Sequence, residues 1–193
     1  MKVLIILGHP NNESYNHAIA QTCVSQIEAN GHSVLFHDLY AEHFNPLLSL
    51  DTEAENTELD NQIKTHREDL MNCDGIIVIH PNWWGQPPAI IKGWLDRVLS
   101  PGVAYQFVEK DGKHVLLGLL KAKNAIVINT SNTPSEAGDN LLDSIWTDRV
   151  FKFCGINNVE CKNISVIKDC DVSQRNKWLA EIKEMMNTYF GQK

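Results

Sequence analysis

Apolar residues along the chain follow two alternating spacings. Short apolar runs, of the kind found in strands buried on both faces, predict five strands, at 3–7, 33–38, 75–79, 125–129 and 158–167. Apolar residues at helical spacing predict five helices, at 15–30, 52–72, 89–99, 141–153 and 172–190. A regular alternation of this kind is typical of a single parallel sheet with helices on both faces, so the predicted fold class is α/β.

Residues 103–121 depart from this alternation. Lys110-Asp111-Gly112 lies within them, and an Asp-Gly pair is typical of the tight turn of a β-hairpin. We therefore expect two short hairpin strands here. The first apolar run ends at Gly8-His9-Pro10 and lacks the longer apolar stretch and the small residues of a secretory signal, so we interpret it as a buried strand.

Composition and charge narrow the classes of function. The 193 residues suit one domain over 1–193. A formal charge of −7 gives no general attraction to nucleic acid or anionic lipid, and no apolar run approaches the roughly 20 residues that span a bilayer. The five cysteines are odd in number and form no CxxC pair, which favours a reduced cytoplasmic protein over a disulfide framework or a zinc site.

Histidines are scattered along the chain, and none of the pairs has the spacing of metal ligands on one helix face. We expect five of them to lie on the surface: His32, His37, His43, His66 and His114. No metal site is predicted. Ligands of parallel α/β sheets bind beyond the carboxyl ends of the strands, so the candidate chemistry lies in the loops 8–16, 80–88 and 129–139.

The first of these loops joins a predicted strand to a predicted helix, where free N–H groups favour an anion. It offers His9 and short hydrogen-bonding side chains but no Lys or Arg. It also lacks the GxGxxG of dinucleotide-binding units and the GxxxxGK[ST] of nucleotide triphosphatases. A phosphate held by amides, hydroxyls and one histidine fits this loop. The alternative is that Ser14 or Asn16 simply caps the helix.

The second loop carries two adjacent tryptophans between prolines. Pro81, Pro87 and Pro88 stiffen it and remove backbone donors. Trp83 and Trp84 cannot both face one core layer, so we expect one of them to be partly exposed and to offer a stacking surface for a flat aromatic ligand. The alternative is that both indoles pack at the edge of the sheet.

These loops resemble those of a known family. The stretch 81–99 reads PNWWGQPPAIIKGWLDRVL and, with Gly-Val-Ala-Tyr at 102–105, strongly resembles the NAD(P)H:quinone oxidoreductase family, with its diaphorase-like members. Residues 8–16 are similar to its first flavin loop, 129–134 to its third, and 153–155 to a later segment. The similarity covers nearly the whole chain and is greatest to the bacterial quinone reductases that accompany potassium-efflux systems.

The resemblance implies a flavodoxin-like three-layer sandwich, with a five-stranded parallel sheet in the order 2-1-3-4-5, and a flavin at the carboxyl ends of the strands. By position, it assigns three groups of residues to the flavin. They are His9, Ser14, Tyr15 and Asn16 for the phosphate and ribityl chain, Pro81, Asn82, Trp83, Trp84 and Gly85 along the isoalloxazine ring, and Thr130, Ser131 and Asn132 at its pyrimidine edge.

The implied activity is ping-pong transfer of two electrons from NAD(P)H through the flavin to a quinone or similar flat acceptor. The flavin carries that chemistry, so no side chain receives a catalytic assignment. Members of the family are typically homodimers with the active site at the interface, and Tyr105 and Phe107 match aromatic positions that reach toward the partner's substrate pocket.

The third loop departs from the mammalian members. Ser131 and Asn132 replace a pair of glycines, and the Tyr and His credited with stabilising the reduced flavin do not follow. A shorter loop after the second strand leaves both FMN and FAD open as the cofactor. Two other functions remain: a flavodoxin-type electron carrier, and a redox-sensing regulatory subunit associated peripherally with a potassium-efflux antiporter.

Overall fold

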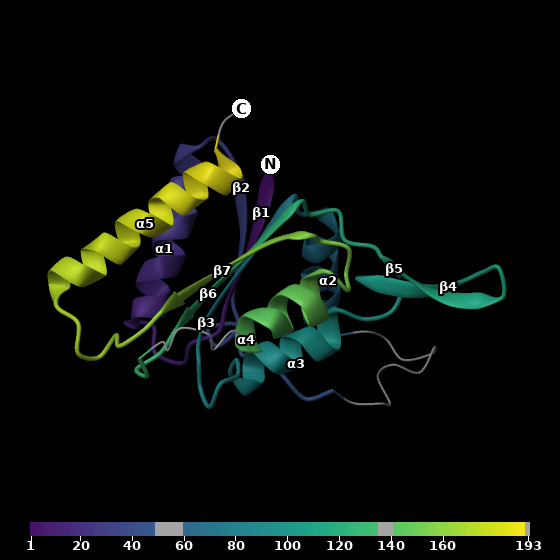
Figure 1. Cartoon of the computed structure of the whole chain (residues 1–193), viewed down its shortest axis with the longest axis horizontal. Helices are drawn as coiled ribbons and strands as arrows, with labels where there is room; N and C mark the ends of the chain where they lie inside the picture. Colours follow the sequence, from purple (N-terminus) through teal and green to yellow (C-terminus); the bar gives the residue numbers. More distant parts are fainter. Residues whose placement is uncertain (49–59, 135–140, 192–193) are drawn as a thin grey trace.

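A five-stranded parallel sheet runs through the centre of the molecule (Figure 1). The computed structural model describes residues 1–48, 60–134 and 141–191. The sheet strands are β1 (Lys2–Leu7), β2 (Ser33–Asp38), β3 (Gly75–Pro81), β6 (Asn124–Thr130) and β7 (Asn158–Ile164). Their spatial order is β2-β1-β3-β6-β7, and every neighbouring pair is parallel. Counted within the sheet, this is the predicted order 2-1-3-4-5.

The sheet divides the core into two apolar layers. Along β1, Val3, Ile5 and Leu7 belong to one cluster of buried residues, whereas Leu4 and Ile6 belong to the other. Each strand alternates its side chains between the two faces, so a continuous apolar run supplies both layers at once. The unbroken runs recognised in the sequence are therefore the interior of the sheet.

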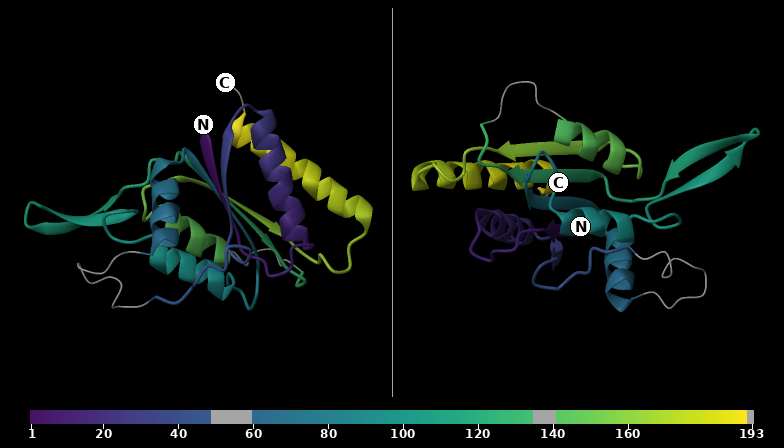
Figure 2. Two further views of the ribbon diagram at one scale, coloured as in Figure 1. Left: turned by 180° about the vertical axis from the view of Figure 1, so that it is seen from behind. Right: turned by 90° about the horizontal axis from the view of Figure 1, so that it is seen from below.

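Helices cover both faces (Figure 2). The helices α1 (Tyr15–Ala29) and α5 (Val172–Phe190) pack on the layer that contains Val3. The opposite layer is covered by α2 (Asn61–Asn72), α3 (Ala89–Val98) and α4 (Leu141–Ser144). The predicted three-layer sandwich is confirmed. None of the helices in the described residues is both long and apolar enough to cross a membrane.

Two predicted boundaries differ from the structure by more than two residues. The helix expected over 52–72 is α2, which begins at Asn61 after its N-cap Asp60, and 49–59 lie outside the described residues. The last sheet strand ends at Ile164 rather than at 167. Both differences arise where polar and apolar residues mix, since periodicity is weak at the ends of an element.

The helix expected over 141–153 is also wrong in detail. Only Leu141–Ser144 is α-helical, and Ile145–Phe151 forms a π-helical segment. Trp146 and Phe151, five residues apart, are both buried, and their rings stack with centroids 5.8 Å apart. A π-helix brings residues five apart onto one face, so it accommodates both rings.

The hairpin expected around residues 110–112 is confirmed as β4 (Tyr105–Lys110) and β5 (Lys113–Gly118), which pair antiparallel. Asp111 and Gly112 connect them, and both have positive φ, as the tight turn between two hairpin strands requires. The hairpin extends away from the sheet at one end of the molecule (Figures 1 and 2).

Candidate functional site

A cavity of about 340 Å³ opens beyond the carboxyl ends of the sheet strands. Every residue predicted to bind the flavin lines it, except Gly85. Gly85 lines a larger cavity of about 440 Å³, which shares Asn82, Trp84, Ser131 and Thr133 with the first. The structure thus gathers three loops that are far apart in the sequence around two adjoining cavities.

The first loop is braced by its own hydrogen bonds. Asn11 donates its backbone N–H to Nδ1 of His9 at 3.1 Å, and its side-chain oxygen accepts the N–H of Glu13 at 2.9 Å. Ser14 is the N-cap of α1, because its Oγ accepts the N–H of His17. Ser14 also lines the smaller cavity, so it both caps the helix and faces a ligand position.

Asn16 is not a cap but a buried bridge between two of the loops. Its side chain is only 3 % exposed, and its Nδ2 donates to Oγ1 of Thr130 at 2.8 Å. Oδ1 of Asn16 and Oδ1 of Asn82 are buried acceptors without a hydrogen-bond partner in the described structure. An unpaired buried acceptor is costly, and the ribityl hydroxyls of a flavin are donors of the kind that these two atoms lack.

The tryptophan loop forms a tight turn. Trp83 and Gln86 exchange backbone hydrogen bonds of 2.9 and 3.1 Å, and between them Trp84 and Gly85 take φ of +57° and +73°. The left-handed region is strained for a bulky residue. The indole of Trp84 is fully exposed, and that of Trp83 is partly exposed beside the ring of His9. Both indoles, not one, are available at the cavities.

A buried histidine anchors the tryptophan loop to the core of the protein. His80 is fully buried and lies directly before Pro81. Its Nδ1 donates to the Pro81 carbonyl at 2.8 Å, and its Nε2 accepts the indole N–H of Trp146 at 3.1 Å. Burial lowers the pKa of His80 to about 4, so the ring is neutral and joins the loop to the π-helical segment.

The larger cavity contains a polar chain that sequence reasoning missed. Nδ2 of Asn163 donates to both carboxylate oxygens of Asp143, at 3.1 and 3.0 Å, and Oδ1 of Asn163 accepts from Asn129. All three line the cavity. Asn129 and Asn163 are paired in the register of β6 and β7. Polar residues near the carboxyl ends of neighbouring strands are a signal that could have found them.

Tyr105 and Phe107 lie apart from both cavities. They stand on β4 and pack against Phe153, with the Tyr105 and Phe153 ring centroids 4.8 Å apart. Neither is among the described residues that line the two cavities of this chain. Their predicted role at a substrate pocket therefore requires the cavity of a second subunit.

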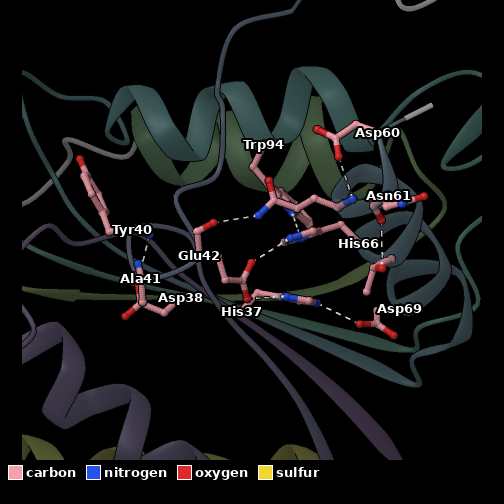
Figure 3. A network of polar contacts seen from close by, with 12 residues as sticks. His37, Asp38, Tyr40, Ala41, Glu42, Asp60, Asn61, His66, Asp69 and Trp94 are labelled. Carbon is pink, nitrogen blue, oxygen red and sulfur yellow. Dashed lines mark hydrogen bonds and ion pairs between the residues drawn. The ribbon is translucent and has the colours of Figure 1, made fainter. Parts of the chain in front are cut away.

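The surface positions expected for His37 and His66 are wrong. The two rings stack with centroids 3.9 Å apart, and His66 is only 1 % exposed (Figure 3). Glu42 accepts from Nδ1 of His37 at 2.9 Å and from Nε2 of His66 at 3.0 Å. Asp69 accepts from Nε2 of His37 at 2.9 Å. Two residues of α2 are thereby fastened to the end of β2.

His37, Glu42 and His66 place ligand-type atoms close enough together to surround a metal ion. Hydrogen-bond directions favour protons instead. The indole of Trp94, which can only donate, bonds to Nδ1 of His66 at 3.0 Å, so Nδ1 accepts and Nε2 carries the hydrogen that faces Glu42. Both nitrogens of His37 face carboxylates, so both carry hydrogen. The lone pairs that a metal would need are occupied.

Comparison with known proteins assigns the family. A protein-family model described as flavodoxin-like fold matches residues 1–186 of the chain. The chain belongs to the flavodoxin-like family. A relative from Haemophilus influenzae, named an uncharacterized NAD(P)H oxidoreductase, is 38 % identical over 83 % of this chain and 81 % of its own.

Two further proteins to which the chain is similar carry more specific names. The NAD(P)H dehydrogenase [quinone] 1 of Rattus norvegicus is 32 % identical over 55 % of this chain, and the matched segment spans about half of that enzyme, 46 %. The structure of an FMN-dependent NADH-azoreductase from Bacillus anthracis, in complex with FMN, has a TM-score of 0.79 at 15 % identity and covers 99 % of this chain and all of its own. The second similarity establishes the fold.

Proposed function

We propose that this flavodoxin-like protein is a flavin-dependent NAD(P)H:quinone oxidoreductase, acting as one domain that passes two electrons from NAD(P)H to a quinone or similar flat acceptor. The observation that carries the proposal is the convergence of three loops on one cavity: a helix start, a pair of exposed indoles and two unpaired buried acceptors. Relatives named NAD(P)H oxidoreductase and NAD(P)H dehydrogenase [quinone] support the class of reaction.

The residues of the smaller cavity divide the work of holding the flavin. The first N–H groups of α1 and the Ser14 hydroxyl would hold the phosphate. Asn16 and Asn82 would offer acceptors to the ribityl hydroxyls, and the exposed indole of Trp84 would offer a flat surface to the ring. The bound flavin supplies the capacity to accept and return a hydride.

NAD(P)H and the acceptor use one place in turn. The larger cavity adjoins the flavin cavity across Trp84 and Ser131, and it is open enough for a flat molecule. No dinucleotide-binding GxGxxG fingerprint occurs in the sequence. A shared slot explains both facts, since the oxidised nicotinamide must leave before the acceptor enters, which is ping-pong exchange.

The active protein is a homodimer in this proposal. Phe107 of β4 is 60 % exposed, and Val115 and Leu117 of β5 are also exposed, so the hairpin presents apolar side chains to solvent. A second subunit covers them and receives Tyr105 and Phe107 beside its larger cavity. The five unpaired cysteines favour a reducing cytoplasm, and any association with a membrane antiporter would be peripheral.

Anaerobic spectroscopy of the purified protein tests the proposed function. The purified protein should be yellow. It should lose its colour rapidly when NADH or NADPH is added, and should regain the colour when a quinone is added afterwards. Mass spectrometry of the released chromophore distinguishes FMN from FAD. A colourless protein that takes up neither flavin contradicts the proposal. Slow bleaching with a persistent semiquinone would instead indicate a flavodoxin-type carrier.

A further inference from the structure

Ser14, His17 and Asp38 form a chain of hydrogen-bonded side chains. Only Ser14 belongs to the predicted flavin site, and the other two have no role assigned so far. Nδ1 of His17 lies 2.9 Å from Oγ of Ser14, and Nε2 of His17 lies 2.9 Å from Oδ2 of Asp38. His17 stands in the first turn of α1, and Asp38 ends β2. The side chains of His17 and Asp38 are only 13 % and 14 % exposed. His17 and Asp38 are therefore largely shielded from solvent, beside the Ser14 hydroxyl.

Asp38 is fixed so that it can only position His17. Its Oδ1 accepts the backbone N–H groups of Tyr40 and Ala41 at 3.1 and 3.2 Å. Its Oδ2 remains for His17, and because a carboxylate only accepts, Nε2 of His17 carries a hydrogen. The ring is thus held in one orientation with Nδ1 aimed at Ser14.

The charge on His17 decides what Ser14 can do. When His17 is neutral, its Nδ1 has a lone pair, and the Ser14 hydroxyl donates its only hydrogen to that atom. When His17 is an imidazolium, Nδ1 donates to Ser14 Oγ, and the hydroxyl hydrogen is free to point into the cavity. Only the protonated pair therefore offers both a positive charge and an O–H donor to a phosphate.

The smaller cavity has few other sources of positive charge. Among its described lining residues there is no Lys or Arg. Arg175 of α5 packs on the ring of Tyr15, but its guanidinium donates to the Ile167 carbonyl and to Cys170. His9 lies beside His17, with ring centroids 6.3 Å apart. Burial lowers the pKa of His9, and since Nδ1 accepts from Asn11, the neutral ring already presents Nε2–H.

We propose that His17, held by Asp38, is a positioning residue of the phosphate site and couples flavin retention to pH through the Ser14 hydroxyl. The inference rests on the proposed flavin function. Asn16 supplies an independent sign of a ligand at this helix start, because it is a buried residue that lines the same cavity and its Oδ1 has no hydrogen-bond partner in the described structure. At a pH at which the imidazole of the unliganded protein is neutral, binding of one phosphate should be accompanied by the uptake of one proton from solvent.

Titration of the full chain with FMN and, separately, with riboflavin tests the coupling, because riboflavin has the ring and ribityl chain but no phosphate. Binding is followed by flavin fluorescence between about pH 7 and about pH 9, above the ordinary imidazole pKa of about 6.5, so that an imidazolium in the complex has to be formed by uptake of a proton. The phosphate, with a second pKa near 6, is mainly dianionic throughout this range. The ratio of FMN to riboflavin affinity should fall with rising pH, by up to about tenfold per pH unit.

Variants separate this coupling from a structural effect. His17→Gln cannot take up the proton, so its FMN to riboflavin ratio should be low and independent of pH. Asp38→Asn should lower the ratio, because it removes the carboxylate that accepts from Nε2 of His17 and holds the ring with Nδ1 toward Ser14. His9→Gln should weaken FMN binding but keep the pH dependence, since neutral His9 already donates. His114→Gln, an exposed position on β5, is the matched control and should match the native protein.

Each outcome decides a different statement. The coupling is overturned if the ratio of FMN to riboflavin affinity in the native protein does not change with pH. It is also overturned if the His17→Gln variant keeps the pH dependence of the native protein. In either case, binding of riboflavin leaves the proposed flavin function intact. Failure of FMN, FAD and riboflavin all to bind overturns the proposed function and this inference together. If His17→Gln does not fold, Asp38→Asn and the native pH profile still decide the question.

Discussion

Trp84 combines two features at the scale of a single residue that seldom occur together. Its backbone lies in the left-handed region at φ +57°, and its indole is fully exposed. Each is unfavourable for the free protein, since a strained backbone costs about 1–3 kcal/mol and an exposed indole leaves a large apolar surface in water. Both are explained if the tryptophan is kept for a ligand rather than for the fold.

Replacing Trp84 therefore separates stability from binding. Trp84→Gly should raise the thermal stability of the flavin-free protein, because glycine adopts positive φ without strain, by about 1 kcal/mol or less after its own chain entropy. The same variant should retain flavin roughly tenfold less well, because a stacking wall is lost. Trp84→Phe keeps a flat ring and serves as the control. Thermal unfolding and flavin fluorescence measure the two effects, and full flavin occupancy in Trp84→Gly would contradict the placement.

At the scale of the element, the stacked histidines join α2 to the end of β2 (Figure 3). Burial acts to lower the pKa of His37, but hydrogen bonds and charges from Glu42 and Asp69 outweigh it and raise the pKa. Burial likewise acts to raise the pKa of Glu42, and His37 and His66 outweigh it and lower the pKa to about 2. The helix is therefore attached by charges whose strength depends on pH.

The sign of that dependence follows from the two shifts. The contribution of His37 to stability is complete below its unfolded pKa, near 6.5, and is lost as pH rises through its raised folded pKa. The contribution of Glu42 is present above about pH 4.3 and is lost as pH falls toward 2.

His37→Gln should accordingly lower the free energy of unfolding by about 2 kcal/mol near pH 6, with the deficit shrinking toward alkaline pH. Urea denaturation of native protein and variant at a series of pH values measures the difference. Titrating groups outside this network, such as His80, contribute equally to both proteins and cancel, whereas Glu42 loses part of its own shift with His37. A deficit that is the same at every pH would mean that packing, rather than charge, accounts for the role of His37. The exposed variant His114→Gln should show no deficit.

The elements themselves followed from the sequence because burial leaves a local signature. β1 and β3 are unbroken apolar runs, and the Asp111-Gly112 turn marks the hairpin directly. The histidine network did not follow, because His37, Glu42 and His66 come from three separate segments and none is unusual in its own surroundings. The loops of the candidate site were found by family resemblance and by their place after strands, whereas Asp143 has no local mark.

At the scale of the whole molecule, the hairpin formed by β4 and β5 exposes apolar side chains that nothing in a single chain covers in the described structure. β4 and β5 extend from the body (Figure 2). Their exposed residues include Phe107, Val115 and Leu117. Two-stranded hairpins are marginally stable by themselves, so an apolar hairpin in water needs a partner surface. The second subunit proposed above supplies it.

Phe107→Glu should convert the dimer to a monomer without unfolding the chain, because the side chain is already exposed in a single subunit. Light scattering after size-exclusion chromatography measures the mass, and flavin absorbance shows whether the cavity survives. Quinone reduction should fall more than flavin content, since Phe107 is proposed to complete the substrate pocket of the partner. Lys113→Glu, a charged exposed position on β5, is the control. A Phe107→Glu protein that stays dimeric and fully active would contradict the interface.

The bond between Asn16 and Thr130 links the start of α1 to the carboxyl end of β6. Both residues line the smaller cavity, so this one contact fixes the distance between two of its walls. A change at either residue should therefore alter both walls together, although the two positions lie 114 residues apart in the chain.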